Sequence, residues 1–259
     1  MTEQAVIETA KRALGLIDLT DLNDDCSSAD IADLCARANT AHGPVAAVCV
    51  WPRFVAQCVD ALQGTPVKVA TVVNFPHGGD ELFSVLEETR KAIRDGADEI
   101  DLVMPYAAFI GGRRGYAEEM MIRVKAMIPE PAILKVILET GEIEDPLLIH
   151  VASQVAIAAG ADFIKTSTGK VSVNATLEAA EVMLTVIEET RRDMLKDVGF
   201  KPAGGIRTLK DAAAYLVLAD RILGQNWVSA ASFRFGASGL LAAVLGALDG
   251  SGETAGEGY

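Results

Sequence analysis

Two lysines in the second half of the sequence occupy positions where apolar side chains would be expected. Lys165 follows Phe163 and Ile164 in the stretch ADFIKTSTGK, and Lys201 follows Phe200 in VGFKPAGG. A lysine that is buried beside a second cation loses its proton more readily, and its amine can then attack a carbonyl carbon to form a Schiff base. The pair therefore indicates carbonyl chemistry, because an iminium ion accepts electrons when a carbon–carbon bond breaks. Either lysine alone would serve equally well as the partner of a structural carboxylate.

Other short apolar stretches also contain charged residues. Asp18 lies in LIDLT, Asp101 in EIDLV, and Lys135 with Glu139 in LKVILET. Side chains alternate between the two faces of a strand, so each charge can point inward while its apolar neighbours point outward. An isolated buried charge costs roughly several kcal/mol. We therefore expect one paired network of three lysines and three carboxylates, in which Asp101 relays a proton through water.

The elements that must position these residues are short strands that alternate with helices. The spacing predicts helices over residues 80–97, 145–160 and 174–195. Gly96 and Gly160 are predicted to end two of these helices before the next strand. Strict alternation predicts a parallel sheet of the α/β class. The apolar or β-rich stretches span residues 16–20, 46–50, 67–75, 99–104, 133–140, 162–168, 198–204 and 233–238.

Eight such stretches in 259 residues, with no evident linker, favour a single (β/α)8 TIM barrel. The alternative, an open doubly wound sheet, lacks the GxGxxG that usually follows its first strand. We expect residues 1–249 to form the barrel domain, and the Gly- and Glu-rich residues 250–259 to form a flexible tail. Active sites of this barrel lie at the carboxyl ends of its strands, near several of the charged residues.

Two glycine-containing loops indicate a phosphate site. They read AGGIRT at residues 203–208 and FGASG at residues 235–239, after the seventh and eighth predicted strands. In TIM barrels these loops often bind phosphate through backbone N–H groups at a helix N-terminus. Ser238 adds a hydroxyl group, and Arg207 and Lys170 add positive charge. Ordinary glycine turns are the alternative. The pair Gly169-Lys170 is not a nucleotide-binding loop, because Ile164 stands where that motif requires its first glycine.

Composition excludes several classes of function. The net charge of −13 argues against a nucleic-acid or acidic-membrane binder. The four cysteines form no CxxC pair, and the three histidines have no metal-binding spacing, so we expect free thiols and no metal. No signal peptide and no run of about 18 apolar residues is recognisable. These features predict a soluble cytoplasmic protein.

Taken together, the motifs resemble the deoxyribose-phosphate aldolases, which are class I Schiff-base aldolases of (β/α)8 fold. The resemblance covers about residues 13–240 and is carried by LIDLTDLND, VCVWPRF, VVNFPHG, GADEIDLVMPY, LKVILETG, GADFIKTSTGK, VGFKPAGGIR and RFGASGLL. It implies that Lys165 forms the Schiff base, that Lys201 perturbs it and that Asp101 relays the proton. It implies substrate or phosphate binding by Asp18, Thr20, Lys135, Thr168, Gly169, Lys170, Gly204, Gly205, Arg207, Gly236 and Ser238.

The resemblance also implies the reaction, which is reversible cleavage of 2-deoxy-D-ribose 5-phosphate to D-glyceraldehyde 3-phosphate and acetaldehyde. No cofactor is implied, a homodimer is expected, Cys49 lies near the site, and the terminal Tyr259 matches a tyrosine proposed to assist proton transfer. The chain departs from the family pattern at Gly239, often a serine, at Trp51, commonly a tyrosine, and in the composition of its tail. Two alternatives stay open: a Schiff-base aldolase with another donor, and a non-catalytic phosphosugar-binding barrel.

Overall fold

The computed structural model describes residues 2–251, and its central feature is a sheet of eight parallel strands. Neighbouring strands follow the order β10-β1-β4-β5-β6-β7-β8-β9. A separate antiparallel hairpin is formed by β2 (Asn39–Thr40) and β3 (Gly43–Pro44). The strands of the main sheet are β1 (Ile17–Asp21), β4 (Ala47–Val50), β5 (Lys68–Val73), β6 (Glu99–Val103), β7 (Ile133–Ile137), β8 (Phe163–Lys165), β9 (Gly199–Lys201) and β10 (Phe235–Ala237).

The sheet closes into a barrel where β9 meets β10. Parallel bridges join Phe200 to Phe233 and Ala203 to Gly236. The backbone N–H of Arg234 donates to the carbonyl oxygen of Phe200 at 3.0 Å. The predicted single (β/α)8 barrel is therefore confirmed. Each of the eight predicted stretches overlaps one strand of the barrel, and β1 extends one residue beyond its stretch, to Asp21.

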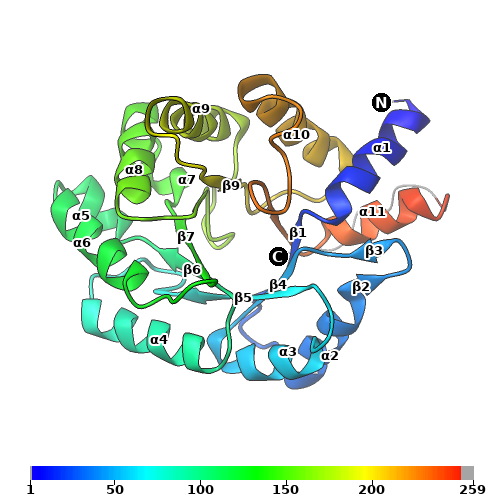
Figure 1. Ribbon diagram of the computed structural model, residues 1–259, viewed down its shortest axis with the longest axis horizontal. Helices are drawn as coiled ribbons and strands as arrows, with labels where there is room; N and C mark the ends of the chain where they lie inside the picture. The colour runs from blue at the N-terminus through cyan, green and yellow to red at the C-terminus, as the bar shows by residue number, and fades with distance from the viewer. Residues whose placement is uncertain (1, 252–259) are drawn as a thin grey trace.

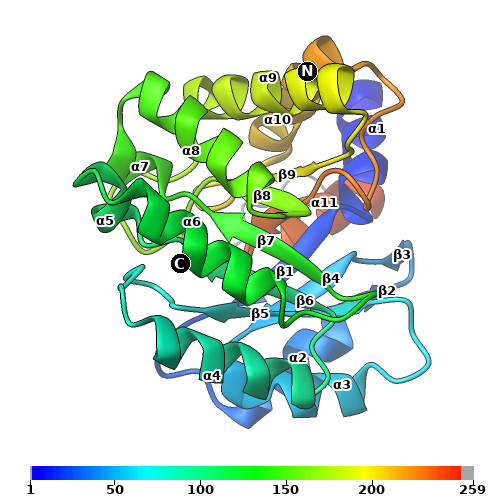
Figure 2. The ribbon, with the colours of Figure 1, turned by 60° about the vertical axis from the view of Figure 1, so that its left-hand side comes forward.

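Helices surround the strands, as Figure 1 shows. The first and last helices, α1 and α11, lie side by side in both ribbon views and so complete the outer layer (Figures 1 and 2). The helices are α1 (Glu3–Leu14), α2 (Ser28–Arg37), α3 (Val55–Ala61), α4 (Leu82–Arg94), α5 (Tyr106–Ile110), α6 (Arg114–Lys125), α7 (Thr140–Ile143), α8 (Pro146–Ala158), α9 (Leu177–Met194), α10 (Leu209–Leu223) and α11 (Leu240–Leu248), with a 3-10 turn at Pro52–Phe54.

Local signals account for the helix ends. The three predicted helices correspond to α4, α8 and α9, and the chain turns after the first two at Gly96 and Gly160 with φ of 96° and 102°. Glycine adopts this left-handed conformation without steric cost. The hydroxyl groups of Thr176 and Thr208 accept backbone hydrogen bonds at the N-termini of α9 and α10. These caps fix where each helix begins after its strand.

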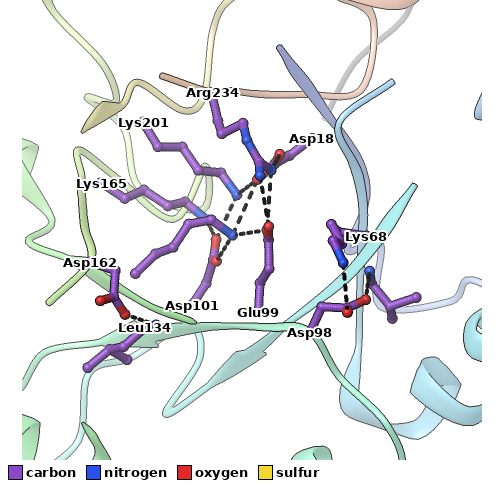
Figure 3. A network of polar contacts seen from close by, with 12 residues as sticks. Asp18, Lys68, Asp98, Glu99, Asp101, Leu134, Asp162, Lys165, Lys201 and Arg234 are labelled. Carbon is purple, nitrogen blue, oxygen red and sulfur yellow. Dashed lines mark hydrogen bonds and ion pairs between the residues drawn. The ribbon is translucent and has the colours of Figure 1, made fainter. Parts of the chain in front are cut away.

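The two faces of the strands have different surroundings. Outward side chains such as Leu102, Val136 and Ile164 pack with the helices in one large apolar cluster. A second, small cluster includes Cys49 and Ala70 of the neighbouring strands β4 and β5. Charged side chains from other strands also point into the barrel interior (Figure 3). Most of the buried apolar packing therefore lies between the strands and the helices, and the barrel interior also holds the charged groups.

Candidate active site

Seven charged side chains meet inside the barrel, and none of these residues is more than 6% exposed. Figure 3 shows six of these side chains pointing toward one another, from β1, β6, β8, β9 and the residue before β10. The seventh, Lys135 of β7, forms ion pairs with three of the carboxylates. Five of the six residues predicted for the network are present, and Glu99 and Arg234, which were not predicted, also belong to it. Its members are Asp18, Glu99, Asp101, Lys135, Lys165, Lys201 and Arg234.

Asp101 is shared by three lysines. Its Oδ2 atom lies 2.8 Å from the Nζ of Lys165 and 2.8 Å from the Nζ of Lys201. Its Oδ1 atom lies 3.0 Å from the Nζ of Lys135. Sheet register produces this arrangement, because Asp101 is paired with Lys135 and Lys165 with Lys201 across adjacent strands. The sequence prediction that Lys165 and Lys201 are neighbours is confirmed.

Arg234 links the remaining two carboxylates. Its Nη1 lies 2.7 Å from Asp18 Oδ1, and its Nη2 lies 2.8 Å from Glu99 Oε1. Asp18 Oδ2 lies 2.5 Å from the Nζ of Lys201, and Lys135 also pairs with Glu99. Glu99 could have been found from the sequence, because it lies two residues before Asp101 and so shares its face of the strand. Arg234 likewise lies two residues before Gly236 and so shares its face of the strand.

Burial and neighbouring charge move the pKa values of the two central lysines in opposite directions. Burial lowers the pKa of Lys165, and the nearby Lys201 lowers it further, although Asp101 opposes both. Burial also acts on Lys201, but Asp101 and Asp18 outweigh it and raise its pKa well above the usual value. The pKa of Asp101 is held well below its usual range, because Lys135, Lys165 and Lys201 outweigh the effect of burial. Lys165 is thus the lysine poised to become a neutral amine.

The carboxylate of Glu139 bonds to Thr168 and not to a lysine of the network, so its predicted place in the network is wrong. The strand β7 ends at Ile137, and Glu139 has a φ of 58°, so the alternation of faces no longer applies there. The Glu139 carboxylate instead accepts hydrogen bonds from the N–H of Thr168 at 3.1 Å and from its hydroxyl at 2.6 Å. Burial raises the pKa of Glu139. Its role in the structure is to hold the loop that follows Lys165.

Three further residues border the network. The hydroxyl of Thr20 donates to the carbonyl oxygen of Asp18 at 2.7 Å. Cys49 is the neighbour of Thr20 across β1 and β4 and is fully buried, and burial raises the pKa of its thiol. Thr166 was not predicted, yet its hydroxyl accepts the N–H of Ala203 at 3.0 Å and ties the two loops after β8 and β9 together. Tyr259 lies outside the described residues.

The predicted phosphate loops form a pocket next to the lysines. A Cβ atom at Gly236 would lie 2.7 Å from the Cβ of Ala203 and 3.1 Å from the Cε of Lys201, so glycine is needed for this close approach. Gly204 has a φ of 84°, which also favours glycine. Lys170 and Gly169 are not part of this pocket lining. The pocket is lined by Gly204, Gly205, Ile206, Arg207, Gly236, Ala237 and Ser238.

Two helices begin beside this pocket, and they differ at their N-termini. The N-terminus of α10 is closed by a capping box, in which Thr208 and Asp211 each bond the other's backbone N–H. The N-terminus of α11 follows Ser238 and Gly239 and has no side-chain cap. Backbone N–H groups at an uncapped helix start attract anions. The geometry therefore favours α11 as the anion-binding helix of the pair.

The part of the chain from residue 2 to residue 251 contains no group of three or more His, Cys, Asp or Glu side chains placed to hold a metal ion. In that same part, no helix has both the length and the apolar character needed to span a membrane. All four cysteines are free thiols, as predicted.

Comparison with known proteins gives consistent results. Residues 12–243 match the model of a family described as DeoC/LacD family aldolase. A curated deoxyribose-phosphate aldolase of Agrobacterium fabrum is 55% identical over 244 residues, which cover 94% of this chain and 93% of that protein. Two crystal structures provisionally assigned as deoxyribose-phosphate aldolases are also similar. One, from Coccidioides immitis, is 31% identical with a TM-score of 0.77 and covers 89% of this chain and 83% of that one. The other, from Toxoplasma gondii ME49, is 25% identical with a TM-score of 0.85 and covers 95% and 97%.

Proposed function

Since the chain belongs to the DeoC/LacD family of aldolases, we propose that it reversibly cleaves 2-deoxy-D-ribose 5-phosphate to D-glyceraldehyde 3-phosphate and acetaldehyde. One observation within the site carries the proposal. Lys165 and Lys201 contact the same oxygen of Asp101, and their pKa values move in opposite directions. A neutral amine beside a permanent cation is the arrangement that Schiff-base chemistry requires.

The proposed reaction begins at Lys165. Its neutral Nζ attacks C1 of the open-chain sugar, and loss of water gives an iminium ion. A base then removes the proton of the C3 hydroxyl, the C2–C3 bond breaks, and its electron pair moves into the iminium to form an enamine. Glyceraldehyde 3-phosphate leaves at this point. Protonation of the enamine at C2 and hydrolysis of the imine then release acetaldehyde and return the Lys165 amine.

Asp101 and Lys201 have different roles in this scheme. Asp101 lies 2.8 Å from each of the two lysine Nζ atoms, so we assign it the transfer of protons through water between substrate and lysine. Lys201 stays protonated, because Asp101 and Asp18 raise its pKa. Its charge disfavours protonation of Lys165 before attack. It also lies close enough to serve as a proton donor when water leaves.

We assign the phosphate group to the pocket formed by the loops after β9 and β10. Gly204, Gly205 and Gly236 let the backbone approach the anion, and Ser238 and Arg207 border the same pocket. The N-terminus of α11 lacks a side-chain cap, so its first N–H groups have no capping side chain to compete with an anion. Gly239 removes the hydroxyl that the family often has here, so backbone N–H groups and Ser238 must provide the contact.

The direct test is product formation from 2-deoxy-D-ribose 5-phosphate, with acetaldehyde detected by its NADH-dependent reduction in a coupled assay. We expect turnover without added metal or cofactor. Rates of aldol addition with a panel of other aldehyde and ketone donors distinguish this function from that of a related aldolase that uses another donor. Binding of the sugar phosphate without turnover would instead favour a non-catalytic phosphosugar-binding barrel and contradict the proposal.

Three expectations from the sequence accompany this proposal and stay predictions: the homodimer, the cytoplasmic location and the part of Tyr259 in proton transfer. The tyrosine can be tested separately. A Tyr259→Phe variant should turn over more slowly while forming the same imine at Lys165, because only the later proton transfer at C2 would be affected. A variant with unchanged turnover would remove the terminal residue from the mechanism.

A further inference from the structure

Arg234 is a charged member of the barrel interior that the proposed reaction scheme does not use. It lies immediately before β10 and is 6% exposed. Its Nε donates to the carbonyl oxygen of Ala230 at 2.5 Å, and its two terminal nitrogens contact Asp18 and Glu99. The guanidinium carbon also lies 5.8 Å from the ring centre of Phe163. These contacts hold the side chain in one position and place a single positive charge between two carboxylates.

The charges of the network do not balance if every member is ionised. Four cations, Lys135, Lys165, Lys201 and Arg234, face three carboxylates, Asp18, Glu99 and Asp101. Uncompensated charge inside a protein is costly, so a neutral network is favoured. An arginine does not lose its proton in proteins, so one lysine must supply the neutral group.

The contacts indicate which lysine this is. Lys135 lies within 3.6 Å of all three carboxylates, and Lys201 contacts Asp18 and Asp101. Lys165 contacts Asp101, and it shares the same oxygen with Lys201. Lys165 therefore gains least from being charged. Without Arg234, three lysines would match three carboxylates, and the protonated form of Lys165 would be favoured.

We propose that Arg234 is a positioning residue for the aldol reaction, which engages Asp18 and Glu99 with a permanent charge and thereby leaves Lys165 as the surplus cation. This inference rests on the Schiff-base role proposed for Lys165. Arg234 acts through the carboxylates and needs no contact with substrate. Glu99 is its counterpart, because its charge opposes the loss of a proton at Lys165.

The titratable groups around Lys165 come from β1, β4, β6, β7 and β9, from the residues that follow β7 and from the residue before β10. Asp101, Lys201 and Cys49 act electrostatically on Lys165, and Lys165 in turn acts on Glu139, whose oxygens bond to Thr168. Burial raises the pKa of Cys49, so its thiol adds little charge at neutral pH. The more distant members are Asp18, Glu99, Lys135 and Arg234. The lowered pKa of Lys165 agrees with a network in which the other three cations satisfy the carboxylates.

The test is the pH dependence of kcat/KM for cleavage of 2-deoxy-D-ribose 5-phosphate in four proteins: the native chain, Arg234→Met, Glu99→Gln and the double variant. The acid limb of this profile reports the ionisation of free-enzyme groups, including the attacking amine. In Arg234→Met the acid limb should move to higher pH by about one unit. At pH values below the limb, this shift lowers kcat/KM about tenfold. In Glu99→Gln the limb should move to lower pH.

The double variant gives the sharpest readout, because it removes one positive and one negative charge together. Three cations then face two carboxylates, so the network again has one cation more than it has carboxylates. Its acid limb should return toward that of the native chain, even though two buried contacts have been lost. A purely structural role for Arg234 predicts the opposite, since the double variant would then be at least as impaired as the single one.

Two controls separate charge from packing. Arg12→Met removes another arginine that contacts a carboxylate through two nitrogens, Asp220 at 2.5 and 2.6 Å, on the outside of the barrel. It should lower the melting temperature without moving the pH profile. Arg234→Lys keeps the charge, so its acid limb should stay at the native position even if its rate falls.

Each outcome has a defined meaning. A native-like pH profile in Arg234→Met, or a double variant no closer to the native profile than Arg234→Met, would overturn the inference. If Arg234→Met does not fold, the Glu99→Gln profile decides, and an unmoved or alkaline-shifted limb would overturn the inference. Failure of the proposed function is seen separately, because the native chain would then show no turnover at any pH.

Discussion

Replacing Lys201 by methionine should slow Schiff-base formation by an amount that depends on pH. Methionine fills nearly the same volume without the charge. The Nζ atoms of Lys165 and Lys201 each lie 2.8 Å from one Asp101 oxygen, so they are at most about 5.6 Å apart. At an effective dielectric constant of about 20, two unit charges at that distance repel by about 3 kcal/mol. Loss of this repulsion favours the protonated, unreactive form of Lys165.

An energy of about 3 kcal/mol corresponds to roughly a hundredfold change in the fraction of neutral amine. We therefore expect kcat/KM of Lys201→Met to be about a hundredfold below the native value near pH 7, and the deficit to shrink as pH rises. The variant also leaves Asp18 and Asp101 with one cation fewer, which acts in the same direction, because both carboxylates then favour a charged Lys165.

The assay is the pH profile of kcat/KM together with a thermal melt of each protein. Lys125→Met is a matched control, because Lys125 pairs with Asp162 at 2.6 Å outside the charged network. It should change stability and leave the profile in place. A Lys201→Met deficit of constant size at every pH would refute the electrostatic reasoning, and would instead indicate that Lys201 acts only as a proton donor or as structural support.

Three further predictions follow from the site. Lys165→Met should abolish turnover while keeping a cooperative thermal melt by circular dichroism; residual native-rate activity would exclude Lys165 as nucleophile. Ser238→Ala should raise KM for 2-deoxy-D-ribose 5-phosphate roughly tenfold and spare the unphosphorylated sugar, since a hydrogen bond to a charged group contributes about 1.5–3 kcal/mol; equal effects on both sugars would remove Ser238 from phosphate binding. Neighbouring cations depress the pKa values of Asp18 and Asp101 in the folded state, so the stability they contribute should be complete above about pH 4 and lost as pH falls further. Urea unfolding of Asp18→Asn should show a flatter acid dependence than the native chain, and an equal slope would contradict this.

The sequence was sufficient to predict the barrel and the central lysine pair. Alternation of faces identified Lys165 and Lys201 as inward residues, and their consecutive strands made them neighbours. The same rule would have reached Glu99, but the predicted strand begins at that residue, and a charge at a strand start usually reads as part of a loop. Arg234 lies at the equivalent edge of the last strand.

Alternation of side chains along a strand does not predict which residues of non-adjacent strands contact one another across the barrel. Arg234 meets Asp18 through strand pairing, because β10 lies next to β1, but its contact with Glu99 of β6 depends on how the strands are staggered around the closed sheet. Glu139 shows the opposite limit. Its stretch reads as continuous strand, yet β7 ends two residues earlier and the backbone turns to positive φ. The bonds to Thr168 that stabilise this turn come from a distant part of the sequence.

In the proposed mechanism, Lys165 is the amine that attacks the substrate carbonyl. The most direct measurement is reduction of the native protein with borohydride in the presence of acetaldehyde, followed by mass spectrometry of its peptides. We expect a two-carbon adduct on Lys165 and none on Lys201, because the pKa of Lys165 is lowered and that of Lys201 is raised. An adduct on Lys201 would reverse the assignment of the two lysines. Absence of any adduct, in protein that still binds 2-deoxy-D-ribose 5-phosphate, would contradict Schiff-base catalysis altogether.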